Sequence, residues 1–262
     1  MQVRRVPALA GWRWVIEGFA VLAASPLPLI ATGILMLFCL LVASALPVVG
    51  DFLPLILSPA LSFGYLQAIR LAQEGQKPPP STLFSGLRPG AGVVMRSLLL
   101  IGLINATASA FALAATVLID GGEWLRMLMR VQETTPKQVP PETVYAALTF
   151  MLLYAPLQVA LWYAPLFAGL HRTPPLKALV FSAVAVWRNK GAFVMYFAGW
   201  FAVAVGLTML VQVLVVVIPG GLGPLLMAPA LLLLMAALYC SFWLSYRDTV
   251  DPIAIDAPPP PR

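Results

Sequence analysis

Charged side chains are scarce in this sequence. Only 10% of its 262 residues are Asp, Glu, Lys or Arg, and 61% are apolar. Soluble domains usually carry about 25% charged residues, so a water-soluble globular domain is excluded. The composition predicts an all-α fold, a polytopic transmembrane helical bundle. The length suits one domain of about six bilayer-spanning helices.

Groups that commonly carry chemistry are also few. His171 is the only histidine, and the two cysteines, Cys39 and Cys240, lie in apolar runs without nearby ligands. The chain has no Ser–His–Asp set, no metal-ligand cluster and no glycine loop suited to phosphate. We therefore expect no enzyme activity, no metal and no cofactor. His171 stands beside Arg172, which predicts a solvated residue at the cytoplasmic rim.

Ionisable residues are absent from the middle of the predicted spans. Proton- and ion-coupled transporters generally place such groups there, so a coupled pump is disfavoured, although passive permeation is not. The net charge of +6 is explained by cations that flank the spans, and we expect no nucleic-acid partner.

Six long apolar segments are predicted to span the bilayer. Their approximate ranges are 27–48, 52–71, 97–119, 144–170, 192–218 and 222–246. They make residues 1–246 a single integral membrane domain, followed by a Pro-rich cytoplasmic tail at 247–262. Interior prolines bend helices by removing a backbone donor. Candidate kinks therefore lie at Pro59, Pro156, Pro165 and Pro229.

A short amphipathic segment precedes each pair of spans, at 8–24, 81–88 and 174–190. In the first, Leu9, Trp12, Ile16, Phe19 and Ala23 recur at three- and four-residue spacing, as expected for a helix lying at the membrane interface. An ordinary helix packed on the cytoplasmic end of the bundle fits the same pattern, and both readings can hold.

The loops alternate in charge. Of 16 cations, 13 fall on one side of the predicted membrane and 3, all in the 121–142 loop, on the other. With five carboxylates on each side, the balances are +8 and −2. Cationic loops stay in the cytoplasm. Both termini are therefore predicted to be cytoplasmic, with the 121–142 loop outside.

An internal repeat links the first and last pairs of spans. Residues 54–61 (PLILSPAL) match residues 224–231 (PLLMAPAL) at a constant offset of 170. Weaker echoes, Ala-Pro-Leu, occur at 155–157 and 164–166. The chain is therefore interpreted as three helical hairpins, each preceded by a short interfacial helix.

Small and polar residues within the spans are candidates for helix contacts. A small-residue stripe on the third span favours close helix packing; it comprises Gly102, Ala106, Ala110 and Ala114. The main intramembrane amides are Asn105, Gln158 and Gln212. They favour hydrogen bonds between helices over a solute site.

Cations beside the second and third surface segments are candidate contacts for anionic lipid headgroups. They are Arg88, Arg172, Lys177, Arg188 and Lys190. Each such cation near an anionic surface contributes about 1 kcal/mol. A role in setting topology and nothing more explains them equally well. Membrane lipids are thus the expected partners, together with other membrane proteins or a second copy of the chain.

Three stretches of the sequence carry a resemblance to known proteins: Ala164-Pro165-Leu166 through Pro175, Ala178-Leu179 and Ser182 to Trp187-Arg188-Asn189; Gly11-Trp12-x-Trp14 with Phe19 and Ser25-Pro26; and Leu83-Phe84-x-Gly86-Leu87. In these stretches the chain resembles a family of uncharacterised proteobacterial inner-membrane proteins with about six spans. The resemblance covers most of residues 10–246. It implies the fold and a bacterial inner-membrane location, and it brings no established activity.

The leading functional hypothesis is a non-enzymatic scaffold or accessory subunit that contacts lipid and other membrane proteins. The alternative is a permease or channel for a small neutral or amphipathic solute, with the Pro-bent second, fourth and sixth spans as movable elements. A polar cavity that reaches Asn105, Gln158 or Gln212 favours transport. A solid bundle with a large apolar contact face favours a scaffold.

Overall fold

The computed structural model describes residues 3–88, 90, 92–129, 140–217 and 222–250, with backbone alone at 214–217 and 222–226. The described residues are mostly helical, and they contain no strand beyond one isolated bridge between Val3 and Val250. The elements are α1 (Ala10–Ala24), α2 (Pro26–Ser44), α3 (Leu53–Gln73), the 3₁₀ helix η1 (Pro80–Leu87), α4 (Gly92–Asp120), α5 (Glu123–Met129), α6 (Pro141–Leu161), α7 (Ala164–Leu170), α8 (Pro175–Arg188), α9 (Lys190–Val217) and α10 (Leu222–Thr249).

Six segments among the described residues are long and apolar enough to cross a membrane. They are Pro26–Ser44, Leu53–Gln73, Gly92–Asp120, Pro141–Leu170, Lys190–Val213 and Met227–Thr249. The predicted all-α polytopic bundle with six spans is confirmed. Helix α10 continues to Thr249, so residues 247–249 of the predicted tail are helical. Residues 251–262 lie outside the described part of the chain.

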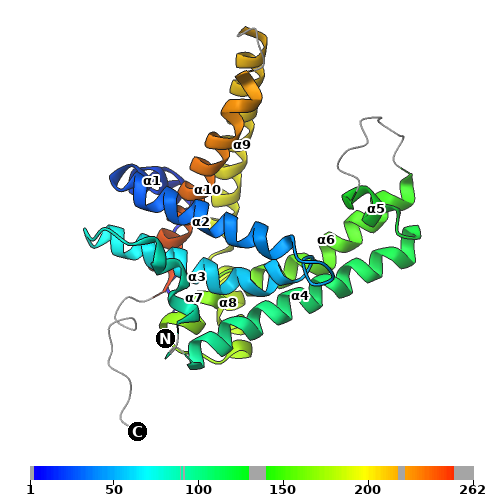
Figure 1. Ribbon diagram of the computed structural model, residues 1–262, viewed down its shortest axis with the longest axis horizontal. Helices are drawn as coiled ribbons and strands as arrows, with labels where there is room; N and C mark the ends of the chain where they lie inside the picture. The colour runs from blue at the N-terminus through cyan, green and yellow to red at the C-terminus, as the bar shows by residue number, and fades with distance from the viewer. Residues whose placement is uncertain (1–2, 89, 91, 130–139, 218–221, 251–262) are drawn as a thin grey trace.

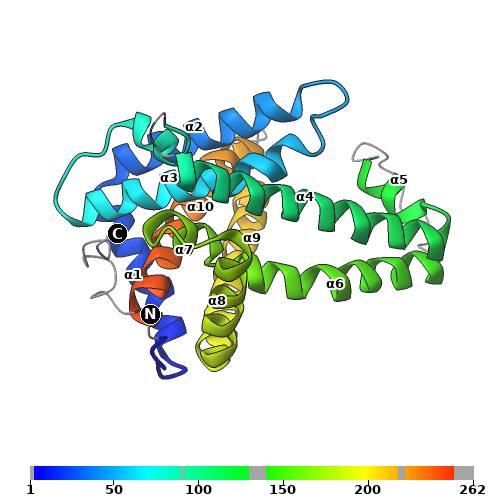
Figure 2. The ribbon, with the colours of Figure 1, turned by 90° about the horizontal axis from the view of Figure 1, so that it is seen from below.

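The spans form three hairpins, α2–α3, α4–α6 and α9–α10, and each follows a short helix (Figure 1). The first two hairpins run alongside each other in both views, whereas α9–α10 projects from the centre in another direction (Figures 1 and 2). The second short helix is a 3₁₀ helix, η1, rather than an α-helix. Gly64 allows η1 to lie against α3, because a Cβ there would collide with the backbone of Leu83.

Helix α1 holds the base of the projecting hairpin. A Cβ at Gly11 would collide with the Ala192 carbonyl of α9, and one at Gly18 would stand 2.7 Å from Ser241 Cβ of α10. The packed alternative for this segment is therefore confirmed for one face. The predicted apolar stripe occupies the other face, where Trp12 and Ile16 are exposed.

The fourth span is not one helix. It is interrupted at Trp162 and Tyr163, between α6 and α7. Pro165 falls in the first turn of α7, where a missing N–H leaves no bond unmade, so it starts a helix instead of bending one. Pro156 lies inside α6. Pro59 and Pro229 lie inside α3 and α10.

Candidate functional site

A cavity of about 250 Å³ lies where α3, α4, α6, α7 and α10 meet. Its lining combines long apolar side chains with several uncharged polar ones. The lining residues are Ser58, Pro59, Ser62, Leu66, Asn105, Gln158, Leu161, Trp162, Pro165, Leu166, Leu238, Tyr239 and Phe242. All three hairpins contribute to this wall, and none of the described side chains that line it is charged.

Two of the three predicted intramembrane amides meet in this cavity. Asn105 accepts a hydrogen bond from the Tyr154 hydroxyl at 3.3 Å, and its NH₂ group has no recorded acceptor among the described residues. The Gln158 amide likewise makes no recorded hydrogen bond within that part of the chain. The third amide, Gln212, lies exposed on α9 and does not line the cavity. Asn105 therefore joins α4 to α6 through Tyr154, as predicted. Gln158 instead lines the cavity.

Other polar atoms of the wall are arranged more tightly. The hydroxyls of Ser62 and Tyr239 lie 3.0 Å apart and join α3 to α10. The indole N–H of Trp162 is buried and has no acceptor among the described residues. A buried donor without an acceptor costs free energy, and such groups in native proteins call for an explanation.

The α3 part of the wall is shaped by Pro59. Its missing N–H frees the carbonyl of Leu55 one turn earlier. The Ser58 hydroxyl donates to that carbonyl at 3.1 Å. Within a membrane, freed backbone groups must be satisfied in this way. The proline can therefore stand in the wall at little cost to α3.

The break between α6 and α7 is held by Ser182 of α8. The Tyr163 N–H donates to Ser182 Oγ at 2.8 Å, and Ser182 Oγ donates to the Val159 carbonyl at 3.2 Å. Val159 and Tyr163 are the pair that a continuous helix would join directly. The hydroxyl is thus inserted into the helical ladder, a recognised cause of kinks. This arrangement sets Trp162 and Pro165 in the cavity wall.

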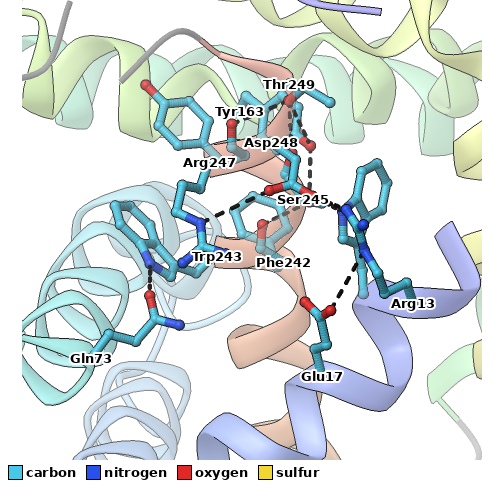
Figure 3. A network of polar contacts seen from close by, with 12 residues as sticks. Arg13, Glu17, Gln73, Tyr163, Phe242, Trp243, Ser245, Arg247, Asp248 and Thr249 are labelled. Carbon is cyan, nitrogen blue, oxygen red and sulfur yellow. Dashed lines mark hydrogen bonds and ion pairs between the residues drawn. The ribbon is translucent and has the colours of Figure 1, made fainter. Parts of the chain in front are cut away.

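A polar network ties the ends of α10, α1, α3 and α7 together (Figure 3). The Tyr163 hydroxyl donates to Ser245 Oγ at 2.8 Å, and the Trp243 indole donates to Gln73 Oε1 at 2.8 Å. His171 Nε2 lies 2.8 Å from the Tyr246 hydroxyl. The prediction of a solvated His171 is therefore wrong, since its ring is partly buried and contacts a fully buried tyrosine.

The predicted helix-packing stripe is buried only at its start. Gly102 abuts the Ile56 carbonyl of α3 so closely that a Cβ would collide with it, and Ala106 is buried. Ala110 is half-buried and Ala114 is exposed. A four-residue repeat drifts around a helix with 3.6 residues per turn, so the buried face passes instead through residues 105, 109, 112 and 116.

The five predicted lipid-contacting cations are all exposed. They are Arg88, Arg172, Lys177, Arg188 and Lys190. Two of them, Lys177 and Arg188, lie on α8 beside an exposed apolar stripe that includes Leu176, Val180 and Trp187. Lys177 and Lys190 lie over the rings of Phe181 and Trp187, each 5.4 Å from the centroid. The structure places these cations apart from the cavity.

Trp162 and Tyr239 were not singled out by sequence reasoning. The available signal was the position of Trp162 next to the Pro165 break, which brings a large polar-tipped ring to an irregular point in the backbone. Tyr239 offered no local signal, because its partner Ser62 lies 177 residues away in the chain.

Comparison with known proteins assigns the family. No family model and no solved structure matches the chain. A protein of Burkholderia thailandensis named as a probable inner membrane protein is 34% identical over 251 residues, covering 94% of this chain and 93% of that protein. The chain belongs to the family of this inner membrane protein. The resemblance inferred from the sequence is confirmed, and the six apolar helices agree with it.

Proposed function

We propose that this inner membrane protein is non-enzymatic and binds a small neutral or amphipathic solute in its central cavity, as a permease or channel does. The meeting of the Asn105 and Gln158 amides in that cavity carries the proposal. This is the arrangement that favours transport over a purely structural role. The Pro-containing α3, together with α6 and α7, supplies most of the wall.

The chemistry of the wall specifies the class of solute. Within the described part of the chain the cavity lining carries no charge, and an unpaired ion is very costly to move into such surroundings. Amides and hydroxyls offer both donors and acceptors, whereas Leu161, Leu166 and Phe242 offer apolar contact. A volume of about 250 Å³ lies just below the usual range for ligand pockets. A short-chain alcohol or amide fits these conditions.

Photolabelling tests the binding step. The probe is 3-azioctanol, a small neutral alcohol with a photoreactive group, applied to the purified chain in neutral detergent. Labelling is expected at cavity residues and is expected to fall several-fold in Gln158→Leu. The matched control is Gln212→Leu, the same exchange at a glutamine outside the cavity, and it should label as the wild type does. Equal labelling in all three chains would refute the proposal.

Solute flux tests the transport step. Proteoliposomes are mixed rapidly with a glycerol solution, which creates a glycerol gradient across their membrane, and their volume change is followed by light scattering. Faster equilibration than in empty liposomes, lost in a Leu238→Trp chain whose cavity is filled, supports permeation. Binding of 3-azioctanol without flux would instead indicate a ligand-binding protein that does not transport.

A second candidate function is a scaffold or accessory subunit, supported by the projecting hairpin α9–α10 (Figure 1). Along α9, the side chains of Val194, Phe197, Phe201 and Met209 are exposed. Such a face suits lipid or the helices of another membrane protein. A photo-crosslinking amino acid at Phe201 tests this role in cells. A discrete protein adduct supports it, and adducts with lipid alone would argue against it.

We propose that both termini lie in the cytoplasm. Of the 16 cations, 13 fall in the segments on the same side of the predicted spans as the termini, and cationic loops stay in the cytoplasm. We also propose that the exposed cations beside α8 contact anionic lipid. Single cysteines in the 121–142 loop and before α1 test the orientation. An impermeant thiol reagent added to intact cells should label the loop alone.

A further inference from the structure

A second pocket, which shares no lining residue with the cavity, is lined by four arginines. It has a volume of about 430 Å³, and its charged lining consists of Arg4, Arg5, Arg13, Arg247 and Asp248. Four cations and one anion give this lining a net charge of +3. The pocket lies at the joined ends of α1 and α10, on the side predicted to be cytoplasmic. None of these arginines belongs to the cationic set that the sequence suggested for lipid.

The segment that carries Arg4 and Arg5 is fixed by its backbone. The Arg4 N–H donates to the Thr249 carbonyl at 2.9 Å, and the Arg4 carbonyl accepts from Asn189 Nδ2 at 3.0 Å. A bridge between Val3 and Val250 extends this attachment. The backbone that carries the two arginines is therefore already in place, so a ligand has only their exposed side chains to order.

Two further arginines are set by Asp248. Arg13 Nη2 donates to Asp248 Oδ2 at 2.8 Å, and Arg247 Nε lies 3.9 Å from Oδ1 (Figure 3). The Trp14 indole donates to Oδ2 at 2.9 Å, which fixes the carboxylate itself. Arg13 also lies 3.5 Å from Glu17. Each guanidinium group carries five donors, so the two carboxylates beside Arg13 and the one beside Arg247 leave further donors for an anion.

We propose that this arginine pocket binds a phosphate group. Guanidinium groups match phosphate oxygens in paired hydrogen bonds, and several of them converge here on one site. A phospholipid headgroup is the favoured source, because the exposed apolar stripe of α1, with Leu9, Trp12 and Ile16, adjoins Arg13. A soluble phosphate ester has the same chemistry.

The test uses the full-length chain in neutral detergent. Dioleoylphosphatidylglycerol and dioleoylphosphatidylcholine are titrated and detected by native mass spectrometry, and glycerol 3-phosphate is titrated by calorimetry. Arg4→Gln with Arg5→Gln should weaken phosphatidylglycerol binding by roughly 30-fold, since each arginine contributes roughly fivefold. Lys77→Gln with Arg96→Gln is the matched control, because it removes two exposed cations that lie outside the pocket and outside the set proposed to contact lipid at α8, and it should leave binding unchanged.

Each outcome decides for or against the proposal. Selective loss of phosphatidylglycerol in the Arg4/Arg5 pair supports a lipid site. If the Arg4/Arg5 pair loses glycerol 3-phosphate binding, and phosphatidylglycerol does not displace glycerol 3-phosphate from the wild type, the site takes a soluble phosphate ester. Equal loss of phosphatidylglycerol and glycerol 3-phosphate binding in both double variants, or no loss in either, refutes the proposal that the arginine pocket binds a phosphate group. Arg4→Lys with Arg5→Lys keeps the charge and should bind with intermediate affinity; it serves the same test if the glutamine pair fails to fold.

Discussion

The hydroxyl of Ser182 offers the sharpest test of how the chain builds its cavity. Ser182→Ala removes both the acceptor of the Tyr163 N–H and the donor to the Val159 carbonyl. Ser182 is fully buried, so no water replaces the lost bonds. Side-chain hydrogen bonds in membrane proteins contribute about 0.6 kcal/mol on average and up to about 1.7. Two lost bonds therefore cost about 1–3 kcal/mol.

The matched control is Ser109→Ala on α4. Ser109 is also buried, but its hydroxyl donates to the Asn105 carbonyl of its own helix at 2.7 Å. That carbonyl keeps its helical partner when the hydroxyl is removed, so the expected loss is within about 0.5 kcal/mol. Stability is measured by reversible unfolding in mixed micelles of increasing SDS content, followed by circular dichroism.

A second readout separates a local role from a global one. If Ser182 sets the break, its loss should also reduce 3-azioctanol labelling at Trp162, because α7 is then free to shift against α6. Equal stability of the two alanine variants would refute the reasoning. It would mean that Val159 and Tyr163 rejoin as a regular helix at no cost, so that the break does not depend on the inserted hydroxyl.

Three further predictions follow from single contacts. Gly64→Val should destabilise the fold by more than about 2 kcal/mol, because its side chain would collide with the Leu83 backbone; a lowered SDS midpoint checks this. Asn189→Ala should expose the N-terminal segment to trypsin at Arg4, because the hydrogen bond from the Asn189 side chain to the Arg4 carbonyl is lost; cleavage no faster than in the wild type would contradict it. Gln158→Leu should raise stability while lowering solute binding, since an amide without a recorded partner is costly in an apolar wall; thermal unfolding measures the first effect.

The sequence predicted those features that depend on solvent. Long apolar runs can be satisfied only in lipid, so six spans and their hairpin order followed from composition and spacing. The face of α1 was also readable, since Trp12 and Ile16 recur at helical intervals. The short helices were recognised for the same reason, although η1 proved to be a 3₁₀ helix.

Features that depend on contacts between distant residues were not predictable. The cavity requires Asn105 of α4 and Gln158 of α6 to lie on the same wall, and no local pattern states which way a helix turns about its axis. The fourth span looked continuous because its hydropathy is continuous, whereas the break depends on Ser182 in another helix. The drift of the small-residue stripe to an exposed Ala114 has a similar cause, since the neighbour of α4 changes along its length.

The two copies of the internal repeat, in α3 and α10, differ at the positions that line the cavity. The two matching segments occupy corresponding places, near the starts of α3 and α10. At an offset of 170, however, Ser58 corresponds to Ala228, and Ser62 corresponds to Leu232. The copy in α3 has hydroxyls where the copy in α10 has apolar side chains, and among the side chains that the structure describes only those of the α3 copy line the cavity. The polar wall is therefore a departure from the repeat, as expected if the shared pattern supports the fold and the differences support the ligand. Accordingly, Ser58→Ala with Ser62→Leu, which restores the α10 pattern in α3, should preserve folding and reduce 3-azioctanol labelling; unchanged labelling would show that the hydroxyls are not part of the site.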